Sequence, residues 1–292
     1  MKYAWIKEHD KEFPITVMCD VLQVSTSGYY GSLMRRPCAQ QLRRQDIAQA
    51  AARSYFESRH IYGYRKVHRD LLEAKIFCCE ETVRRIMRDI GLYSCVRRKF
   101  VLTTDSGHDM AVAENLLDRD FTATTPNQKW VADITYIPTE KGWLYLAAVM
   151  DLYSRRIVGW AMNKHIDSAL VVSAMKMALT QRRPGTSLLH HSDRGSQYAS
   201  ELFQDLLGDN GIVCSMSRKG NCWDNACMES FFGSLKTEWL GEKKYKSRHE
   251  AKNDIFKYIE LFYNRERRHA ALGYLSPAAY EELYEMKQKQ VA

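Results

Sequence analysis

The sequence predicts an α/β protein in which an all-α helix-turn-helix region precedes a mixed-sheet core. Three observations support this class. Before residue 100, apolar residues recur with helical spacing; residues 129–138 alternate and are rich in β-forming residues, with two more strand-like segments after them; and after Asp167, helix-like and strand-like segments follow one another in turn. The chain has 292 residues, 45% of them hydrophobic, which suits two or three folded domains and excludes disorder as its main state.

Short helices are predicted in the first region. Residues 15–22 and 64–72 have helical patterns, and Ser25 or Ser27 is a candidate N-cap for a helix between them. In the second of these helices Val67, Leu71 and Leu72 share a face.

Residues 80–90 form the strongest helical pattern of this region, with one apolar stripe made of Val83, Ile86, Met87 and Ile90. Arg84, Arg85 and Arg88 lie off the stripe, and Gly91 is a candidate C-cap. A helix, a short turn and a helix with a basic outer face indicate a helix-turn-helix whose arginines contact DNA. A small helical bundle with a solvated arginine face is the alternative.

Charge is distributed unevenly and suggests domain boundaries. Residues 35–99 carry a net charge of +9, residues 100–124 carry −4, and residues 125–292 carry +4. A basic block followed by an acidic, threonine-rich connector indicates a DNA-binding module, a linker and a second domain. The expected parts are a helical leader (1–35), a helix-turn-helix region (36–100), a linker (101–124), a mixed-sheet core (125–240) and a helical tail (241–292).

The second domain begins with strands and continues with alternating elements. Residues 129–138, 142–151 and 156–162 predict an antiparallel meander. The segments after it are predicted to be a helix (167–181, capped by Asp167 or Ser168), a strand (188–191), a helix (200–207), a strand (212–215), a helix (225–235) and two tail helices within 248–286.

Three acids occupy distinctive places on these elements. Asp133 lies in the middle of a strand, Asp193 follows a short strand, and Glu229 lies on a later helix. Each acid by itself would ordinarily be a paired or solvated carboxylate. Together they would repel one another, unless Mg²⁺ or Mn²⁺ ions, which prefer oxygen ligands, hold them in place. Two such ions support phosphoryl transfer by activating the attacking oxygen and stabilising the leaving one.

The segments WVADITYI, HSDRGSQY and DNACMESFFGSLK together resemble the DDE transposases and retroviral integrases. The resemblance is closest to the OrfB-type transposases of the IS3 family of bacterial insertion sequences. It extends over nearly the whole chain through MCDVLQVSTSGYY, IYGYRKV, DLYSRRIVGW and YNRERRHAALGYLSP. It implies an RNase H-like core and identifies Asp133, Asp193 and Glu229 as the catalytic triad of metal ligands. The implied reaction is cleavage at the element ends followed by strand transfer into target DNA, with two Mg²⁺ or Mn²⁺ ions and no ATP.

Further residues near the triad are candidates for the site. Lys236 matches the family's basic residue seven positions after the glutamate, a spacing that places both side chains on one helix face; contact with DNA competes with a solvated lysine. Asn225 could orient a ligand or bind DNA, and Lys219 lies in a loop suited to phosphate contact. His190 and His191 precede Asp193 and are expected to pack in the strand rather than assist catalysis. The neighbouring acids Asp224 and Glu238 are expected to tolerate neutralisation.

Several classes of protein are excluded or disfavoured. The eight cysteines form no C-x-x-C pair and the His-His-Cys-Cys spacing of retroviral integrases is missing, so we expect no structural zinc. The chain has no P-loop motif. It also has no apolar run long enough to span a bilayer and no signal peptide, so we expect a cytoplasmic, nucleoid-associated protein.

Two rival functions remain open at this point. An RNase H-type nuclease would share the acids but would not join strands, and a DNA-binding regulator would not cut. The expected partners are the terminal inverted repeats of the element and the target DNA. A homo-oligomer on DNA and an upstream-frame (OrfA-type) partner or fusion are also expected.

Overall fold

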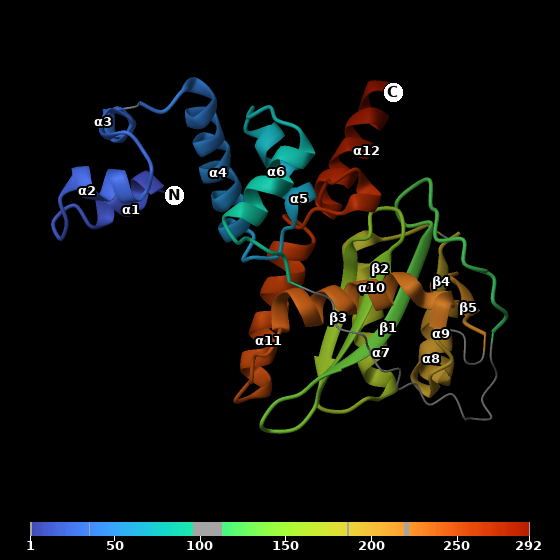
Figure 1. The fold of residues 1–292 in the computed structure, drawn as a ribbon. Helices are drawn as coiled ribbons and strands as arrows, with labels where there is room; N and C mark the ends of the chain where they lie inside the picture. Colours follow the sequence, from blue (N-terminus) through green and yellow to red (C-terminus); the bar gives the residue numbers. More distant parts are fainter. Residues whose placement is uncertain (1, 35, 96–112, 186, 219–221, 292) are drawn as a thin grey trace. The chain divides into compact units, whose positions relative to one another are not determined.

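The structure is a computed structural model that describes residues 2–34, 36–95, 113–185, 187–218 and 222–291 (Figure 1). The chain divides into two compact units, Met1–Tyr93 and Ser94–Ala292. Each unit has its own hydrophobic interior.

Helices alone make up the described part of the first unit: α1 (Lys2–Glu8), α2 (Ile15–Val21), α3 (Thr26–Met34), α4 (Ala39–Glu57), α5 (Tyr64–Glu73) and α6 (Glu80–Asp89). The first three helices pack around a small core of Ile6, Met18, Cys19 and Tyr29. Ser25 is the predicted cap that forms, because its Oγ accepts a hydrogen bond of 3.0 Å from the backbone nitrogen of Gly28.

Helices α4, α5 and α6 contact one another through their apolar stripes. Val67 and Leu71 of α5 and the predicted residues Val83, Ile86 and Met87 of α6 are buried. Leu72 is only partly buried. The prediction for Ile90 is wrong: its side chain is 45% exposed, because α6 ends at Asp89 and the chain turns there. Gly91 follows in the left-handed region, at φ +73°, as the C-cap prediction requires.

Helix α4, the longest helix in the described part of this unit, was not predicted from the sequence. Its buried face consists of Ile47, Ala51, Ser54 and Tyr55. Small and polar side chains make up half of that stripe, so the apolar periodicity is weak although the helix is 19 residues long. Ser54 donates a hydrogen bond of 2.5 Å to Asp70 of α5, which satisfies the hydroxyl inside the interface.

A five-stranded mixed sheet forms the centre of the second unit (Figure 1), with the strands β1 (Lys129–Ile137), β2 (Leu144–Asp151), β3 (Ile157–Asn163), β4 (Leu189–Ser192) and β5 (Val213–Met216). The order is β3-β2-β1-β4-β5. Strands β1, β2 and β3 are the predicted antiparallel meander, whereas β4 runs parallel to both β1 and β5. This order and these directions are the expected RNase H-like arrangement.

One face of the sheet packs against α7 (Ser168–Arg182), α8 (Ser196–Ala199) and α9 (Glu201–Asp209). Trp130, Ala132 and Val149 contribute to this core from the sheet. At Gly159 of β3 a Cβ atom would collide with the backbone of α7, so glycine is what permits the helix to lie this close. Asp167 caps α7 as predicted, its side chain accepting from the Leu170 nitrogen at 3.0 Å.

The remaining elements of this unit include two short 3-10 turns, η1 (Cys222–Asn225) and η4 (Ala270–Leu272), and the helices α10 (Ala226–Ser234), α11 (Arg248–Phe256) and α12 (Pro277–Val291). Helix α10 continues as a π-helix, η2 (Leu235–Leu240), and α11 continues as another, η3 (Lys257–Tyr263). Aromatic rings of these segments pack together, including Phe231, Trp239 and Tyr258. The predicted tail helices therefore belong to the same compact unit as the sheet.

Two polar contacts tie the tail to the sheet. Asn264 exchanges hydrogen bonds of 3.0 Å with both the nitrogen and the oxygen of Ile157 at the start of β3. Glu281 of α12 accepts hydrogen bonds from Ser154 and Arg156 in the β2–β3 turn and from Arg182 at the end of α7. Among the described residues, no helix is long and apolar enough to cross a membrane.

Candidate active site

The three acids singled out in the sequence come from neighbouring elements at one end of the sheet. The register pairs Val131 of β1 with His191 of β4, and Asp133 and Asp193 each follow two residues later. Because these two strands are parallel neighbours, both carboxylates leave the same end of the pair. Glu229 lies in the first turn of α10, which contacts β1.

Asn225 fixes the start of the helix that carries Glu229. It is buried, and its Nδ2 donates a hydrogen bond of 3.0 Å to the carbonyl oxygen of Ala132, the residue before Asp133. The amide therefore joins the helix that carries one acid to the strand that carries another. This burial favours the orienting role for Asn225 over direct contact with DNA.

The electrostatics show that the acids act on one another. The pKa of Asp133 is raised well above its ordinary value, first by burial and then by the negative charges of Asp193 and Glu229. A hydrogen bond of 2.7 Å from the backbone nitrogen of Ile134 and the positive charge of Lys236 oppose this rise. Burial also raises the pKa of Glu229. Within the described residues Asp133 and Glu229 form no ion pair.

This donor set suits a hard cation. The raised pKa of Asp133 shows that the negative charges of the three carboxylates repel one another. A divalent ion bound among them would offset this repulsion. In the part of the chain that the structure describes, no three His, Cys, Asp or Glu side chains are gathered tightly enough to hold a metal.

Lys236 lies between the acids and an aromatic ring. Burial lowers its pKa while the charge of Asp133 opposes that change, and its Nζ lies 4.9 Å from the centroid of the Tyr136 ring. Its position in η2 shows that the α-helical spacing used to relate it to Glu229 does not hold over the whole interval. Both residues nevertheless act electrostatically on Asp133.

The two histidines before Asp193 are both buried. The ring of His191 hydrogen-bonds to Ser215 at 2.8 Å and Ser217 at 3.0 Å, which links β4 to β5 and the residue after it. Burial lowers the pKa of His190 to about 3 and that of His191 to about 4, so both rings are neutral at pH 7. His190 packs against Tyr198 and Phe203. These contacts match strand packing.

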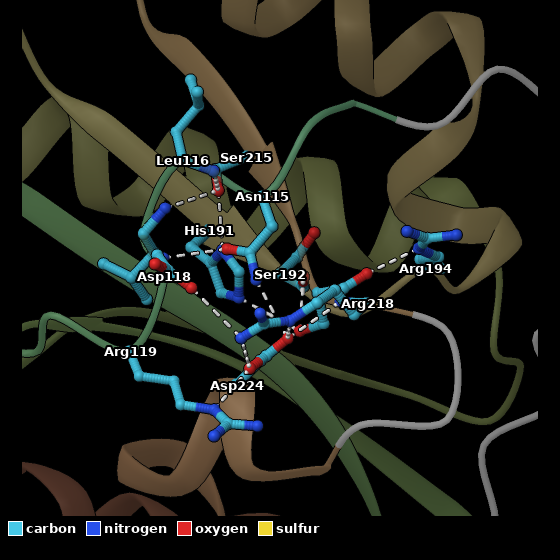
Figure 2. A network of polar contacts seen from close by, with 12 residues as sticks. Asn115, Leu116, Asp118, Arg119, His191, Ser192, Arg194, Ser215, Arg218 and Asp224 are labelled. Atoms are coloured by element: carbon cyan, nitrogen blue, oxygen red, sulfur yellow. Dashed lines mark hydrogen bonds and ion pairs between the residues drawn. The ribbon is translucent and has the colours of Figure 1, made fainter.

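Asp224, five residues before Glu229, is the centre of a network (Figure 2). Its fully buried carboxylate accepts hydrogen bonds of 2.9–3.1 Å from Asn115, Arg119 and Arg218, and these contacts hold its pKa well below its usual range. Glu238 is similarly buried against Arg267 at 2.6 Å. Because of these contacts, replacing either acid would also affect stability; that replacement affects the chemistry far less than replacement of Asp133, Asp193 or Glu229 stays a prediction.

Sequence reasoning missed Tyr198 as well as the role of Asp224. The Tyr198 hydroxyl is buried, has no hydrogen-bond partner in the described structure, and has its pKa raised by burial and by the charges of Asp133 and Asp193. The tyrosine lies five residues after Asp193, but no pattern in the sequence showed that it turns back toward β1. Two of the partners of Asp224 are also distant in sequence, since Asn115 precedes it by 109 residues and Arg119 by 105.

The arginines proposed for DNA contact lie in the other unit, on α6. Arg84 and Arg85 are exposed, and both form ion pairs with Glu81, at 2.6 and 2.8 Å. Hydrogen bonds from these two arginines lower the pKa of Glu81 to about 2. Arg88 is exposed near Asp89, at 3.8 Å. Lys219, the remaining candidate, lies outside the described residues.

Models of known families match three stretches of this chain. A model described as an HTH-like domain matches residues 41–100, and two models described as an integrase core domain match residues 123–222 and 210–277. Together the integrase models include Asp133, Asp193 and Glu229.

Curated relatives match almost from end to end. The chain is 41% identical over 283 residues to the transposase InsF for insertion sequence IS3A of Escherichia coli (strain K12), which covers 96% of this chain and 98% of the relative. The chain belongs to the IS3 family of insertion-sequence transposases. It is also 43% identical over 267 residues to the insertion element IS600 uncharacterized 31 kDa protein of Shigella sonnei, covering 91% of this chain and 98% of that one.

Solved structures with a similar fold include viral integrases. One is the simian T-cell lymphotropic virus intasome in complex with PP2A regulatory subunit B56 gamma (TM-score 0.42, 17% identity, 72% of this chain and 69% of that one). Another is the HTLV-2 integrase catalytic core domain in complex with magnesium in its trimeric form (TM-score 0.42, 16% identity, 55% of this chain and 99% of that one).

Membership of the IS3 family confirms the recognition made from the sequence motifs. The protein is a transposase with an integrase core, a DDE polynucleotidyl transferase, and it carries a helix-turn-helix region for binding DNA. Neither the nuclease nor the non-catalytic regulator considered above describes a chain of this family.

Proposed function

We propose that Asp133, Asp193 and Glu229 are the catalytic carboxylates and that they hold two Mg²⁺ or Mn²⁺ ions. The observation that carries this proposal is the parallel register of β1 and β4. It sets Asp133 and Asp193 at equivalent positions of neighbouring strands, while Asn225 ties the Glu229 helix to the same strand. When bound, such ions supply Lewis-acid activation of the attacking oxygen and stabilisation of the leaving one.

The chain's own residues then position the reacting groups. The carboxylates orient the cleaved phosphodiester at the element end, where water is the first nucleophile. The 3′-OH so exposed is the second nucleophile and displaces a target phosphodiester in line, so that one P–O bond forms as another breaks. Lys236, half-buried beside Asp133, supplies a positive charge for a DNA phosphate at this point.

Further DNA contacts are assigned to Arg84, Arg85 and Arg88 on the exposed face of α6, and to Lys219. These cations would place the element end by contacting phosphates. Glu81 competes for two of the arginines, so binding to DNA would exchange that ion pair for phosphate contacts.

Transposition joins two element ends to one target DNA, so the reaction requires several DNA segments and more than one protein chain. We propose the terminal inverted repeats and the target as the DNA partners, a homo-oligomer on DNA, and an upstream-frame (OrfA-type) partner or fusion, all in the nucleoid of the cytoplasm. We also propose the division into leader (1–35), helix-turn-helix (36–100), linker (101–124), core (125–240) and tail (241–292).

Strand transfer on labelled element-end DNA tests this function. Wild-type protein with Mg²⁺, with and without the upstream-frame partner, should yield both cut ends and joined products. Cut ends without joined products under both conditions would contradict the transposition chemistry proposed for this site. A requirement for the partner would show that this chain acts as part of that assembly.

A further inference from the structure

Two aromatic rings, an exposed Trp143 and a half-buried Tyr136, lie near the proposed catalytic centre. Trp143, at the tip of the β1–β2 hairpin, is 48% exposed, and its ring meets that of Tyr136 edge to face, with the centroids 4.9 Å apart. Tyr136 lies three residues after Asp133 on β1, a distance of about 10 Å along a strand. Lys236 bridges the two places, since its Nζ lies over the Tyr136 ring and its charge acts on Asp133.

The hairpin that carries Trp143 is held firmly. Thr139 donates a hydrogen bond of 2.6 Å to the Gly142 carbonyl oxygen, and Gly142 has a φ of +96°, which a side chain would strain. Arg248 donates from Nε to the Trp143 carbonyl oxygen at 2.9 Å. A rigid tip loses little conformational entropy when a ligand covers the indole.

The tail brings basic side chains to the same hairpin. The backbone nitrogen of Glu140 donates to the carbonyl oxygen of Tyr245 at 2.9 Å, and Thr139 forms a parallel bridge with Tyr245. Lys244 and Lys246, on either side of Tyr245, are exposed, and neither forms an ion pair within the described residues. Aromatic rings beside unneutralised lysines are the combination that binds unpaired nucleic-acid strands.

We propose that Trp143, supported edge to face by Tyr136, forms a stacking platform for an unpaired DNA base near the cut site, with Lys244 and Lys246 contacting the adjoining phosphates. This inference rests on the proposed function, since it takes the DNA end to lie over Asp133. The platform accepts any base, because stacking uses the π-face that all bases share. It would hold the strand open at the end of the duplex, where bases must separate for the phosphate to reach the carboxylates.

Binding to DNA with and without unpaired bases tests the platform. The full chain in Ca²⁺ is titrated with three probes: a blunt duplex, the same duplex with a three-nucleotide single-stranded extension, and oligothymidylate. Trp143→Ala should weaken binding to the extended duplex and to oligothymidylate by about ten-fold and leave the blunt duplex nearly unchanged. Trp143→Phe should retain most of the affinity, because it keeps a ring that can stack.

A matched control is Phe256→Ala on α11, which removes another exposed ring, 46% exposed, that contacts Trp160 instead of the hairpin. This variant should bind all three probes as wild type does. 2-Aminopurine in the extension should be quenched by wild type and by Trp143→Phe but not by Trp143→Ala. Equal binding and equal quenching by wild type and Trp143→Ala would overturn the platform.

Strand transfer in Mg²⁺ tests the proposed function independently of the binding experiment in Ca²⁺. If the wild type joins labelled ends in Mg²⁺ while Trp143→Ala binds the extension normally, the platform is wrong and the catalytic assignment stands. If the wild type joins no ends, the catalytic proposal fails, while the probe titration in Ca²⁺ still decides whether Trp143 stacks on bases.

Discussion

Two groups of acids in the second unit differ in how their charge is handled. Asp224 and Glu238 are buried against arginines, and Glu281 against Arg156 and Arg182. Hydrogen bonds from these arginines lower the pKa of Asp224 and of Glu281. The pKa of Asp133, by contrast, is raised, because its carboxylate is desolvated and lies near the negative charges of Asp193 and Glu229.

The contrast distinguishes acids whose charge is neutralised by arginines within the fold from Asp133, whose charge is not. A buried carboxylate that meets a guanidinium needs nothing more. A carboxylate whose charged neighbours include two other acids costs free energy in the folded protein, and this cost persists unless a cation offsets it. This difference between the arginine-paired acids and the candidate catalytic acids can be tested by metal withdrawal, by substitution and by pH.

Withdrawal of divalent metal should abolish cleavage and joining altogether. Mg²⁺ or Mn²⁺ should restore both reactions, and Ca²⁺, which is larger and less demanding in geometry, should support DNA binding with little chemistry. The measurement is end cleavage across a chelator titration, with DNA binding followed in parallel. Cleavage that persists in excess chelator would show that the three candidate acids do not act by holding a divalent metal.

Removing an arginine-paired acid should cost stability. Glu238→Gln should lower the free energy of unfolding by about 3–5 kcal/mol, because Arg267 would remain buried without its counter-charge. Asp224→Asn should cost less, about 1–3 kcal/mol, because Arg119 and Arg218 are about half exposed. Urea unfolding measures both values.

The exposed Asp205 on α9 is the matched control, and Asp205→Asn should change stability by less than about 0.5 kcal/mol. Equal effects of all three substitutions would show that the arginine contacts contribute nothing measurable.

The pH dependence of stability should have opposite signs in the two groups. The pKa of Asp224 is lowered by folding, so its contribution is present above its unfolded value, about 3.9, and is lost as the pH falls through the folded value. The pKa of Asp133 is raised, so its ionisation destabilises the fold as the pH rises above the unfolded value. Without metal, Asp133→Asn should therefore stabilise the protein at pH 7 and have little effect near pH 3, as urea unfolding at both pH values would show. A destabilised Asp133→Asn protein at pH 7 would group Asp133 with the structural acids.

Replacing the exposed arginines of α6 should have the smallest effect. The triple change of Arg84, Arg85 and Arg88 to alanine should weaken DNA binding and reduce its salt dependence by about one unit of slope per lost phosphate contact. Glu81→Gln should act in the other direction, because it releases Arg84 and Arg85 from their ion pairs. Binding isotherms at several salt concentrations measure both. An unchanged slope in the triple variant would support the solvated-face alternative.

Much of the fold could be predicted because its patterns are local. Strand β1 and the other strands of the meander are rich in β-forming or apolar residues and are separated by short turns, and α6 has an apolar stripe. Helix α4 escaped prediction because Ala51 and Ser54 occupy its buried face. The two π-helical continuations were also missed, since they leave no periodic signal in the sequence.

The site was predictable as a set of residue types at family spacings, but its supporting contacts were not. Asn225 could be named as a neighbour of Glu229, yet its hydrogen bond to Ala132 spans 93 residues. The platform residue Trp143 looked like an ordinary strand residue. Contacts of this kind depend on which segments the sheet order brings together, and no single segment contains that information.

The most direct test of the central claim is strand transfer by Glu229→Gln at saturating DNA. The substitution keeps size and helix propensity, and buried Phe231, Phe232 and Leu235 retain the packing of the helix. We predict that DNA binding stays at or above the wild-type level while joined product falls by several orders of magnitude, as it should for Asp133→Asn and Asp193→Asn, with Asp205→Asn unaffected. A Glu229→Gln protein that binds DNA and still joins ends at nearly the wild-type rate would contradict the account.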